Sequence, residues 1–137
     1  MHTLEQYLQR DKHLPHWAIT GLKNDDEFSF ARIYAEYYPG LFEITYLLVH
    51  DLDEAKDIVA DAFIKLWHKR KSFDNLRSVK GFLYTSIRIN SFDFLKYIQR
   101  LETAKEEYAF WIEFRKELYP SIVPRKKEEN PNLIEKL

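Results

Sequence analysis

Cysteine is absent from the 137-residue chain, and glycine and proline are scarce. Without thiols the chain forms neither disulfides nor thiolate metal sites, and a reducing cytoplasm is the natural location. Three glycines and five prolines are too few for the tight turns of a β-sandwich or β-barrel. No apolar run approaches the roughly 20 residues of a membrane span, and the N-terminus carries charges where a signal peptide would be apolar. We therefore expect a cytoplasmic protein without a membrane span.

Apolar residues recur at helical spacing through nearly the whole chain, which predicts an all-α fold, a compact multi-helix bundle with short connections. Asn24 and Glu27 are spaced as a helix cap and its return acceptor. Pro39 is expected to end that helix and begin another, because proline is best tolerated in a first helical turn. The expected helices cover residues 4–9, 24–38, 39–49, 51–70, about 79–100 and 102–119.

The clearest helix signature lies at residues 51–70. Asp51 is placed to cap the helix, with Glu54 three residues on. Acidic residues crowd its first turn and basic residues its last, which suits the helix dipole. Its expected core stripe is Ala55, Ile58, Val59, Ala62 and Leu66, with Phe63 on the flank. The expected core residues of the 79–100 helix are Leu83, Ile87, Phe94, Leu95 and Ile98.

The expected domain organisation is a helical domain over residues 1–100 and a C-terminal extension over 101–137. The extension reads as an amphipathic helix that Pro120 and Pro124 end, followed by a polar tail.

Catalytic chemistry has little support in the sequence. There is no glycine-rich phosphate loop and no nucleophile with a base nearby. His13 and His16 lie three residues apart, as metal ligands can, but no carboxylate repeats that spacing and a surface pair is favoured. We therefore expect no enzymatic activity, no metal and no cofactor.

Charge is strongly segregated along the chain. Residues 24–61 contain ten acidic and two basic residues, whereas residues 65–100 contain nine basic and two acidic ones. Such segregation suggests two different partners, one of them a polyanion. The alternative is that the two halves attract each other inside the fold.

Two surfaces resist a purely structural explanation. At about 100° per residue, Ile64 falls nearly opposite the core stripe of its helix, among carboxylates, which suits a protein docking site. The neighbours of Ile64 on that face are Asp53, Asp57, Ala60, Asp61 and His68. Single exposed isoleucines are common, so a plain surface residue is the alternative.

The second surface is the segment 72–100, where basic residues interleave with aromatic ones. Aromatic faces stack on unpaired bases while Lys and Arg follow the phosphates of a single strand. The alternative is that most rings belong to the core, which we favour for Phe92 but not for Phe82 and Tyr84.

Three motifs carry a family resemblance over roughly residues 19–100. FARIYAEYYPGLF is followed by DLDEAKDIVADAFIKLW, and then by SF with FLYTSIRIN and Asp93 further on. In this order and spacing they resemble region two of bacterial sigma factors of the extracytoplasmic-function (ECF) group, within the sigma-70 family.

The resemblance implies a transcription initiation factor that docks on core RNA polymerase and recognises and melts the minus-ten promoter element. Residues 55–67 match the element that grips the clamp helices of the largest polymerase subunit, which makes Asp57, Ala60, Asp61 and Ile64 the expected polymerase contacts. The expected DNA contacts, from a base-capture loop and its supporting helix, are Asp74, Asn75, Arg77, Lys80, Phe82, Tyr84, Arg88 and Asn90. An anti-sigma factor is a further partner that the resemblance allows.

The chain departs from the family pattern at three points. Ala60 stands where the family usually has glutamine, and Phe82 stands where tryptophan usually precedes Leu83. Only 17 residues follow Pro120, too few for the second, minus-thirty-five-reading domain, so a fragment or a truncated homologue is expected. These departures keep open a second reading, an interaction protein that binds polymerase or an anti-sigma factor and no longer reads DNA.

Overall fold

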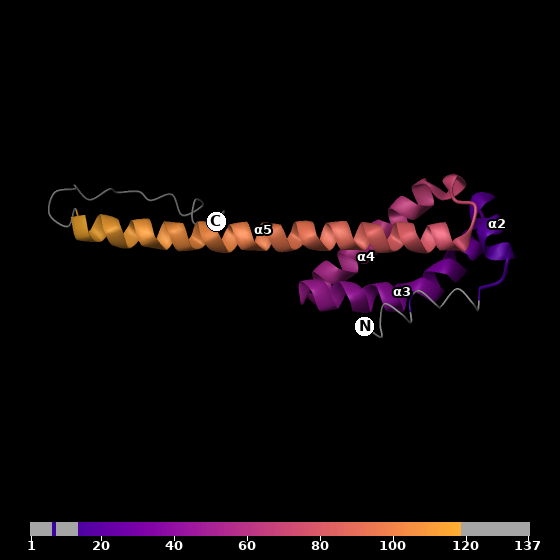
Figure 1. The fold of residues 1–137 in the computed structure, drawn as a ribbon, viewed down its shortest axis with the longest axis horizontal. Coiled ribbons are helices and arrows are strands. Elements are labelled where there is room, and N and C mark those ends of the chain that lie inside the picture. Colours follow the sequence, from indigo (N-terminus) through magenta and orange to yellow (C-terminus); the bar gives the residue numbers. More distant parts are fainter. Residues whose placement is uncertain (1–6, 8–13, 119–137) are drawn as a thin grey trace. The chain divides into compact units, whose positions relative to one another are not determined.

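The computed structural model describes residue 7 and residues 14–118, with side chains up to residue 116. Its elements are α2 (Trp17–Lys23), α3 (Glu27–Val49), α4 (Leu52–His68), a short 3-10 helix η2 (Arg70–Ser72) and α5 (Leu76–Leu118) (Figure 1). This described part contains no strand, and the predicted all-α fold is confirmed. No helix in these ranges is long and apolar enough to cross a membrane. The expected helix over residues 4–9, and His13 of the histidine pair, lie outside the described residues apart from Tyr7.

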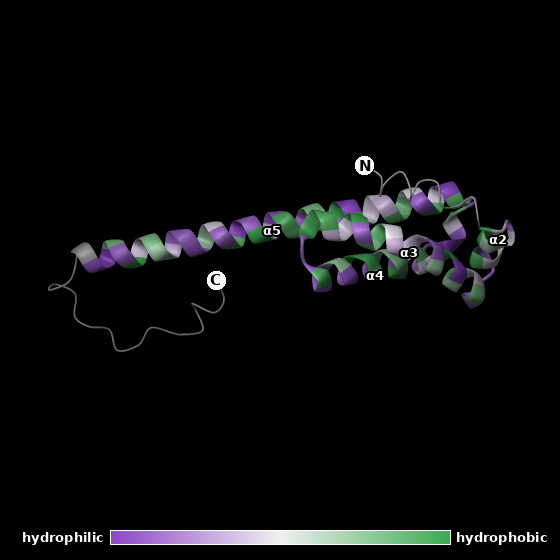
Figure 2. Ribbon diagram, turned by 90° about the horizontal axis from the view of Figure 1, so that it is seen from below, coloured by the Kyte–Doolittle hydropathy of each residue, from purple (hydrophilic) through white to green (hydrophobic). Residues whose placement is uncertain are grey.

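The chain divides into two compact units, residues 1–94 and 95–137. In the first unit the apolar stripes of the four helices form one core, to which Tyr7 also contributes. Figure 2 shows hydrophobic and hydrophilic residues interspersed along each helix, and the buried apolar ones form the core. The largest fully buried aliphatic side chains of this core are Leu22, Ile33, Leu41, Val59, Leu66, Val79, Leu83 and Ile87.

Helix α3 begins later than predicted and is not interrupted. Asn24 ends α2, and the cap of α3 is Asp26, whose carboxylate accepts hydrogen bonds from the Phe28 amide at 3.2 Å and the Ser29 hydroxyl at 2.7 Å. Pro39 lies inside the helix. The proline removes one backbone hydrogen bond, but buried side chains before and after it hold the segment against the core, and the predicted break is wrong.

Helix α4 confirms its prediction in detail. The Asp51 carboxylate accepts a hydrogen bond from the Glu54 amide at 2.9 Å, which is the expected N-cap. The whole predicted stripe and Phe63 are buried. On the opposite face Asp53, Asp57, Ala60 and Ile64 are exposed, whereas Asp61 is half-buried.

Helix α5 is one element where two were predicted. It starts at Leu76, because Asn75 caps it, and runs without a break past residue 101 to Leu118. The residues around the expected break include Glu102, Ala104 and Lys105, which favour helix. Of its predicted core residues, Leu83 and Ile87 are fully buried, whereas Phe94, Leu95 and Ile98 are half-buried.

The described part of the second unit, residues 95–118, is helical throughout. Phe110, Trp111 and Phe114 are exposed and contact one another through their rings, with centroids 5.4–6.0 Å apart.

Candidate functional site

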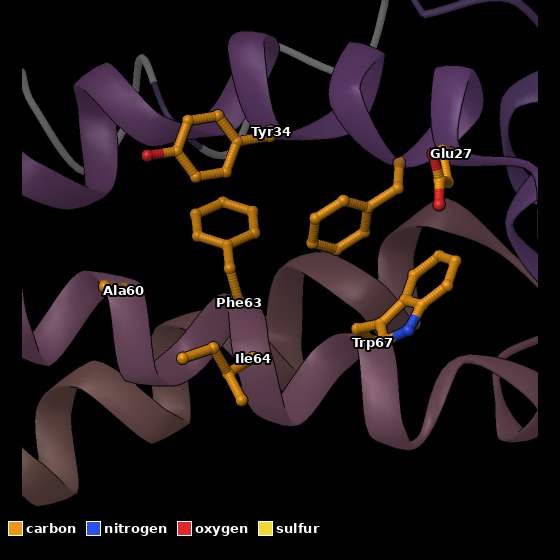
Figure 3. Close-up of a pocket in the computed structure, with 7 residues that line it drawn as sticks. Glu27, Tyr34, Ala60, Phe63, Ile64 and Trp67 are labelled. Atoms are coloured by element: carbon orange, nitrogen blue, oxygen red, sulfur yellow. The ribbon is translucent and has the colours of Figure 1, made fainter.

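A groove of about 540 Å3 lies between α3 and α4. Figure 3 shows Glu27 and Tyr34 reaching it from α3, and Ala60 and Ile64 from α4. Ala60 and Ile64, two of the predicted polymerase contacts, are both exposed, with Ile64 at 55%. The complete lining is Glu27, Phe30, Tyr34, Ala60, Phe63, Ile64 and Trp67.

Aromatic contacts build the floor of this groove. The Phe63 ring lies 4.6 Å from that of Tyr34 and 6.2 Å from that of Phe30, measured between centroids. Trp67 closes one end, with its ring 5.2 Å from Phe30 and 4.1 Å below the guanidinium of Arg70. These ring contacts hold the side chains of the groove walls in place. Binding in the groove would therefore cost little additional side-chain entropy.

Negative charge borders the groove. Asp53 and Asp57 are exposed on the same face of α4 as Ala60, and Glu27 lines the groove itself. Burial, and then the neighbouring carboxylates of Asp57 and Asp51, raise the pKa of Glu54. An apolar surface among carboxylates suits a partner with apolar and basic side chains.

The sequence prediction located the α4 side of this groove and missed the α3 side. Phe30 and Tyr34 belong to a series of aromatic residues at every fourth position of α3, which places them on one helix face. That spacing was the available signal. The stacked members of the series beyond the groove are Tyr38, Phe42 and Tyr46.

The predicted base-capture loop is held from within the chain. Lys23 of α2 donates to the Asp74 carboxylate at 2.7 Å, and this hydrogen bond lowers the pKa of Asp74. The Asn75 side-chain oxygen accepts from the Ser78 amide at 2.8 Å and caps α5. Arg77 is exposed. The loop is therefore tied to α2 on one side and to α5 on the other.

Lys80 is not a surface residue. It is 5% exposed, and its ammonium lies 5.6 Å from the ring centroid of Tyr7 and 6.0 Å from that of Tyr37. The Tyr7 hydroxyl also donates to the Lys80 carbonyl oxygen at 2.8 Å. A lysine that contacts DNA phosphates needs an exposed ammonium group. Because Lys80 is buried, its prediction as a DNA contact is not supported by this structure. The side chain falls on the α5 face that packs on α3, a placement that charge alone did not reveal.

The other predicted DNA contacts occupy two flanks of α5. Phe82 and Tyr84 are separated by roughly 160° around the helix axis, and both are half-buried against the core. Arg88 is exposed, with its guanidinium 5.8 Å from the ring of Phe92, whereas Asn90 donates to Asp61 of α4 at 3.2 Å. Phe92 is 42% exposed, so the interpretation of its ring as core is wrong.

The structure is thus a helical module with a groove between α3 and α4 and with exposed arginines on the first part of α5. A family model, Sigma-70 region 2, matches residues 33–101, just over half of the chain, and the chain belongs to this family. The match covers most of α3, all of α4 and the first part of α5. The family is not a class of enzymes; it implies a sigma-factor role in transcription initiation, with RNA polymerase and promoter DNA as partners. Comparisons with curated proteins and with solved structures gave no significant match.

Proposed function

We propose that this protein is an ECF-type sigma domain that docks on the clamp helices of core RNA polymerase and holds the melted minus-ten strand. Polymerase docking is supported by the groove between α3 and α4. This groove opens beside Ala60 and Ile64 and is bordered by carboxylates. A second role for the same face, as the binding site of an anti-sigma factor, is compatible with its shape and charge.

The absence of a long side chain at residue 60 shapes the docking surface. Glutamine, which the family resemblance leads us to expect here, would extend over the groove, whereas Ala60 leaves it open between Tyr34 and Ile64. An apolar side chain of the polymerase helix would enter that opening. Burial of that apolar side chain would offset the loss of any contact that the side-chain amide of a glutamine at residue 60 would make.

The DNA half of the proposal rests on the basic, aromatic segment at the start of α5. Arg77 and Arg88 are exposed, and Arg88 lies beside the exposed ring of Phe92. Cations follow phosphates while rings and guanidinium planes stack on bases. Asp74, Asn75 and Asn90 would contact DNA only after breaking their hydrogen bonds to Lys23, Ser78 and Asp61.

A second candidate function is an interaction protein that binds polymerase or an anti-sigma factor without reading DNA. It is favoured by the internal engagement of several predicted DNA contacts: Asp74, Asn75, Lys80 and Asn90. Binding to a single-stranded minus-ten oligonucleotide in the presence of core polymerase separates the two candidates.

Docking is tested by pull-down of core polymerase with Asp57→Arg and Ile64→Glu. Both residues are exposed and outside the buried stripe, so the fold should remain intact while affinity falls at least tenfold. Glu102→Arg, an exposed charge reversal outside the matched residues 33–101, is the control. Unchanged affinity of both variants, with unchanged helical circular dichroism, would remove the docking assignment.

A further inference from the structure

The second unit presents an apolar stripe on the outer part of α5. Residues 95–118 form one continuous helix, and no other described element belongs to this unit. Five apolar residues follow one another along this helix at intervals of four, three, four and three positions, which is the spacing of a coiled-coil seam. They are Tyr97, Leu101, Ala104, Tyr108 and Trp111. Tyr97 and Trp111 are more than half exposed, whereas the three residues between them are half-buried.

Charged residues flank this stripe. If its members are assigned to positions a and d of a heptad labelled a to g, Arg100 and Glu107 fall at g and Lys105 falls at e. All three side chains are exposed. Residues at e and g face the partner helix in a coiled coil and set its identity and orientation. The three charges therefore restrict which helix can cover the stripe.

We propose that residues 95–110 pair with the same residues of a second copy of this chain as an antiparallel coiled coil. Leu101 of each copy lies opposite Ala104 of the other, and Tyr97 lies opposite Tyr108. Large side chains thus meet a small one at the centre and rings meet rings on either side. The pair is two-fold symmetric, so each contact is made twice. The inference does not rest on the proposed function.

Charge complementarity selects this register and orientation. The proposed register places Arg100 of each copy beside Glu107 of the other. Moving one helix by a heptad in either direction would instead bring Arg100 against Arg100 or Glu107 against Glu107. A parallel pair would bring Arg100 against Lys105. Opposite charges stabilise the proposed pair and like charges disfavour these alternatives, so the sequence discriminates among them.

Pairing also accounts for a helix that extends through the described part of the second unit. Most helix stability in proteins comes from packing of an amphipathic face, not from helix propensity. Figure 2 shows hydrophobic residues recurring along α5, and a second copy would bury those of the stripe. None of the residues 95–110 lines the groove between α3 and α4, so the proposed pairing uses a separate surface.

Sedimentation equilibrium of the full chain at micromolar concentrations tests the assembly. The unsubstituted chain should form a dimer, and Leu101→Glu should leave a monomer. Arg100→Glu should raise the dissociation constant about tenfold, because two attractive contacts become repulsive. Adding Glu107→Arg to Arg100→Glu should restore the dimer. Lys96→Glu is the matched control, since Lys96 is an exposed base of the same helix outside positions a, d, e and g.

Cysteine cross-linking tests the register, because the natural chain contains no cysteine. Leu101→Cys protein mixed with Ala104→Cys protein should give a mixed disulfide under mild oxidation, and a size tag on one protein identifies it. Each variant oxidised alone should give much less of its own dimer. A parallel pair would give the reverse result.

Three outcomes would overturn the assignment. The first is an unsubstituted chain that remains monomeric. The second is a dimer that Leu101→Glu leaves intact, or one that Arg100→Glu weakens no more than Lys96→Glu does. The third is cross-linking within each cysteine variant that exceeds cross-linking between the two. None of these measurements involves polymerase or DNA, so their failure leaves the proposed function untouched.

Discussion

The carboxylate of Asp61 accepts a hydrogen bond from the side-chain amide of Asn90 at 3.2 Å and an ion pair from Lys65 at 2.9 Å. Asp61 was predicted to contact polymerase, whereas Asn90 was predicted to contact DNA. A single hydrogen bond thus joins the two proposed surfaces across α4 and α5. The same hydrogen bond would couple polymerase docking to DNA binding. A polymerase group that pairs with the Asp61 carboxylate would compete with Asn90 and Lys65 for it, and would free both for DNA.

Asp61→Ala should separate the two activities. Affinity for core polymerase should fall, while the affinity of the isolated protein for single-stranded DNA should rise severalfold, because Lys65 and Asn90 lose their internal acceptor. The rise follows from the roughly 1 kcal/mol upper range of an exposed ion pair. Fluorescence anisotropy with labelled DNA measures it. Asp57→Ala, which removes a carboxylate with no bond to Asn90, should weaken docking and leave the hydrogen bond in place; equal DNA binding by the two variants would contradict the coupling.

Asn75 has a structural role that must be separated from base capture. Asn75→Ala removes the α5 cap and should cost about 1 kcal/mol of unfolding free energy, seen as a lower midpoint in urea. Asn75→Ser keeps a capping oxygen but loses the amide, so it should retain stability and still reduce promoter opening. If promoter opening falls only in the variant whose unfolding free energy falls, Asn75 caps α5 and has no part in base capture.

Lys80 should behave as a core residue. Lys80→Glu places a carboxylate against the rings of Tyr7 and Tyr37 and should destabilise the fold by more than about 2 kcal/mol, because a buried carboxylate loses its hydration. Arg88→Glu makes the same charge change on an exposed side chain and should leave stability within about 0.5 kcal/mol. Chemical denaturation followed by circular dichroism compares them. A stable Lys80→Glu protein would show that the ammonium is not confined to the core.

Stability should depend on pH through Asp25. Its carboxylate accepts from Arg70 at 2.7 Å and pairs with Lys71 at 3.2 Å, and these contacts lower its pKa below the ordinary value of 3.8. A depressed folded-state pKa adds stability that is present above the unfolded value and is lost as pH falls through the folded one. Asp25→Asn, whose side chain tolerates the positive φ of 64° at this position, should remove that part of the pH dependence. Thermal unfolding of both proteins between neutral and strongly acidic pH measures the difference; parallel curves would count against the contact.

The sequence was most informative where one local pattern decided the structure. Asp51 and Glu54 predicted where α4 begins, and its apolar stripe predicted which face is buried. Both signals depend only on residues within the one helix. The exposure of Ala60 and Ile64 followed from the same periodicity. The all-α fold followed from the helical spacing of apolar residues along nearly the whole chain.

Errors arose where tertiary contacts decide the outcome. Pro39 reads as a helix break, yet burial on both sides keeps α3 continuous. Lys80 was predicted to be a surface cation, yet its ammonium lies beside the rings of Tyr7 and Tyr37, which are far from it in sequence. The groove also needs two helices, and a helical wheel of α4 alone contains no information about Phe30 or Tyr34. Such pairings depend on how helices dock, which no single-helix pattern specifies.

Helix α4 has 17 residues and three separate surfaces, which limits how the protein can evolve. Six of its side chains are buried in the core, one of these (Phe63) also lines the groove with Ala60, Ile64 and Trp67, and Lys65 lines a second pocket beside α5. A substitution on the groove side of α4 can therefore also disturb the core or the pocket beside α5.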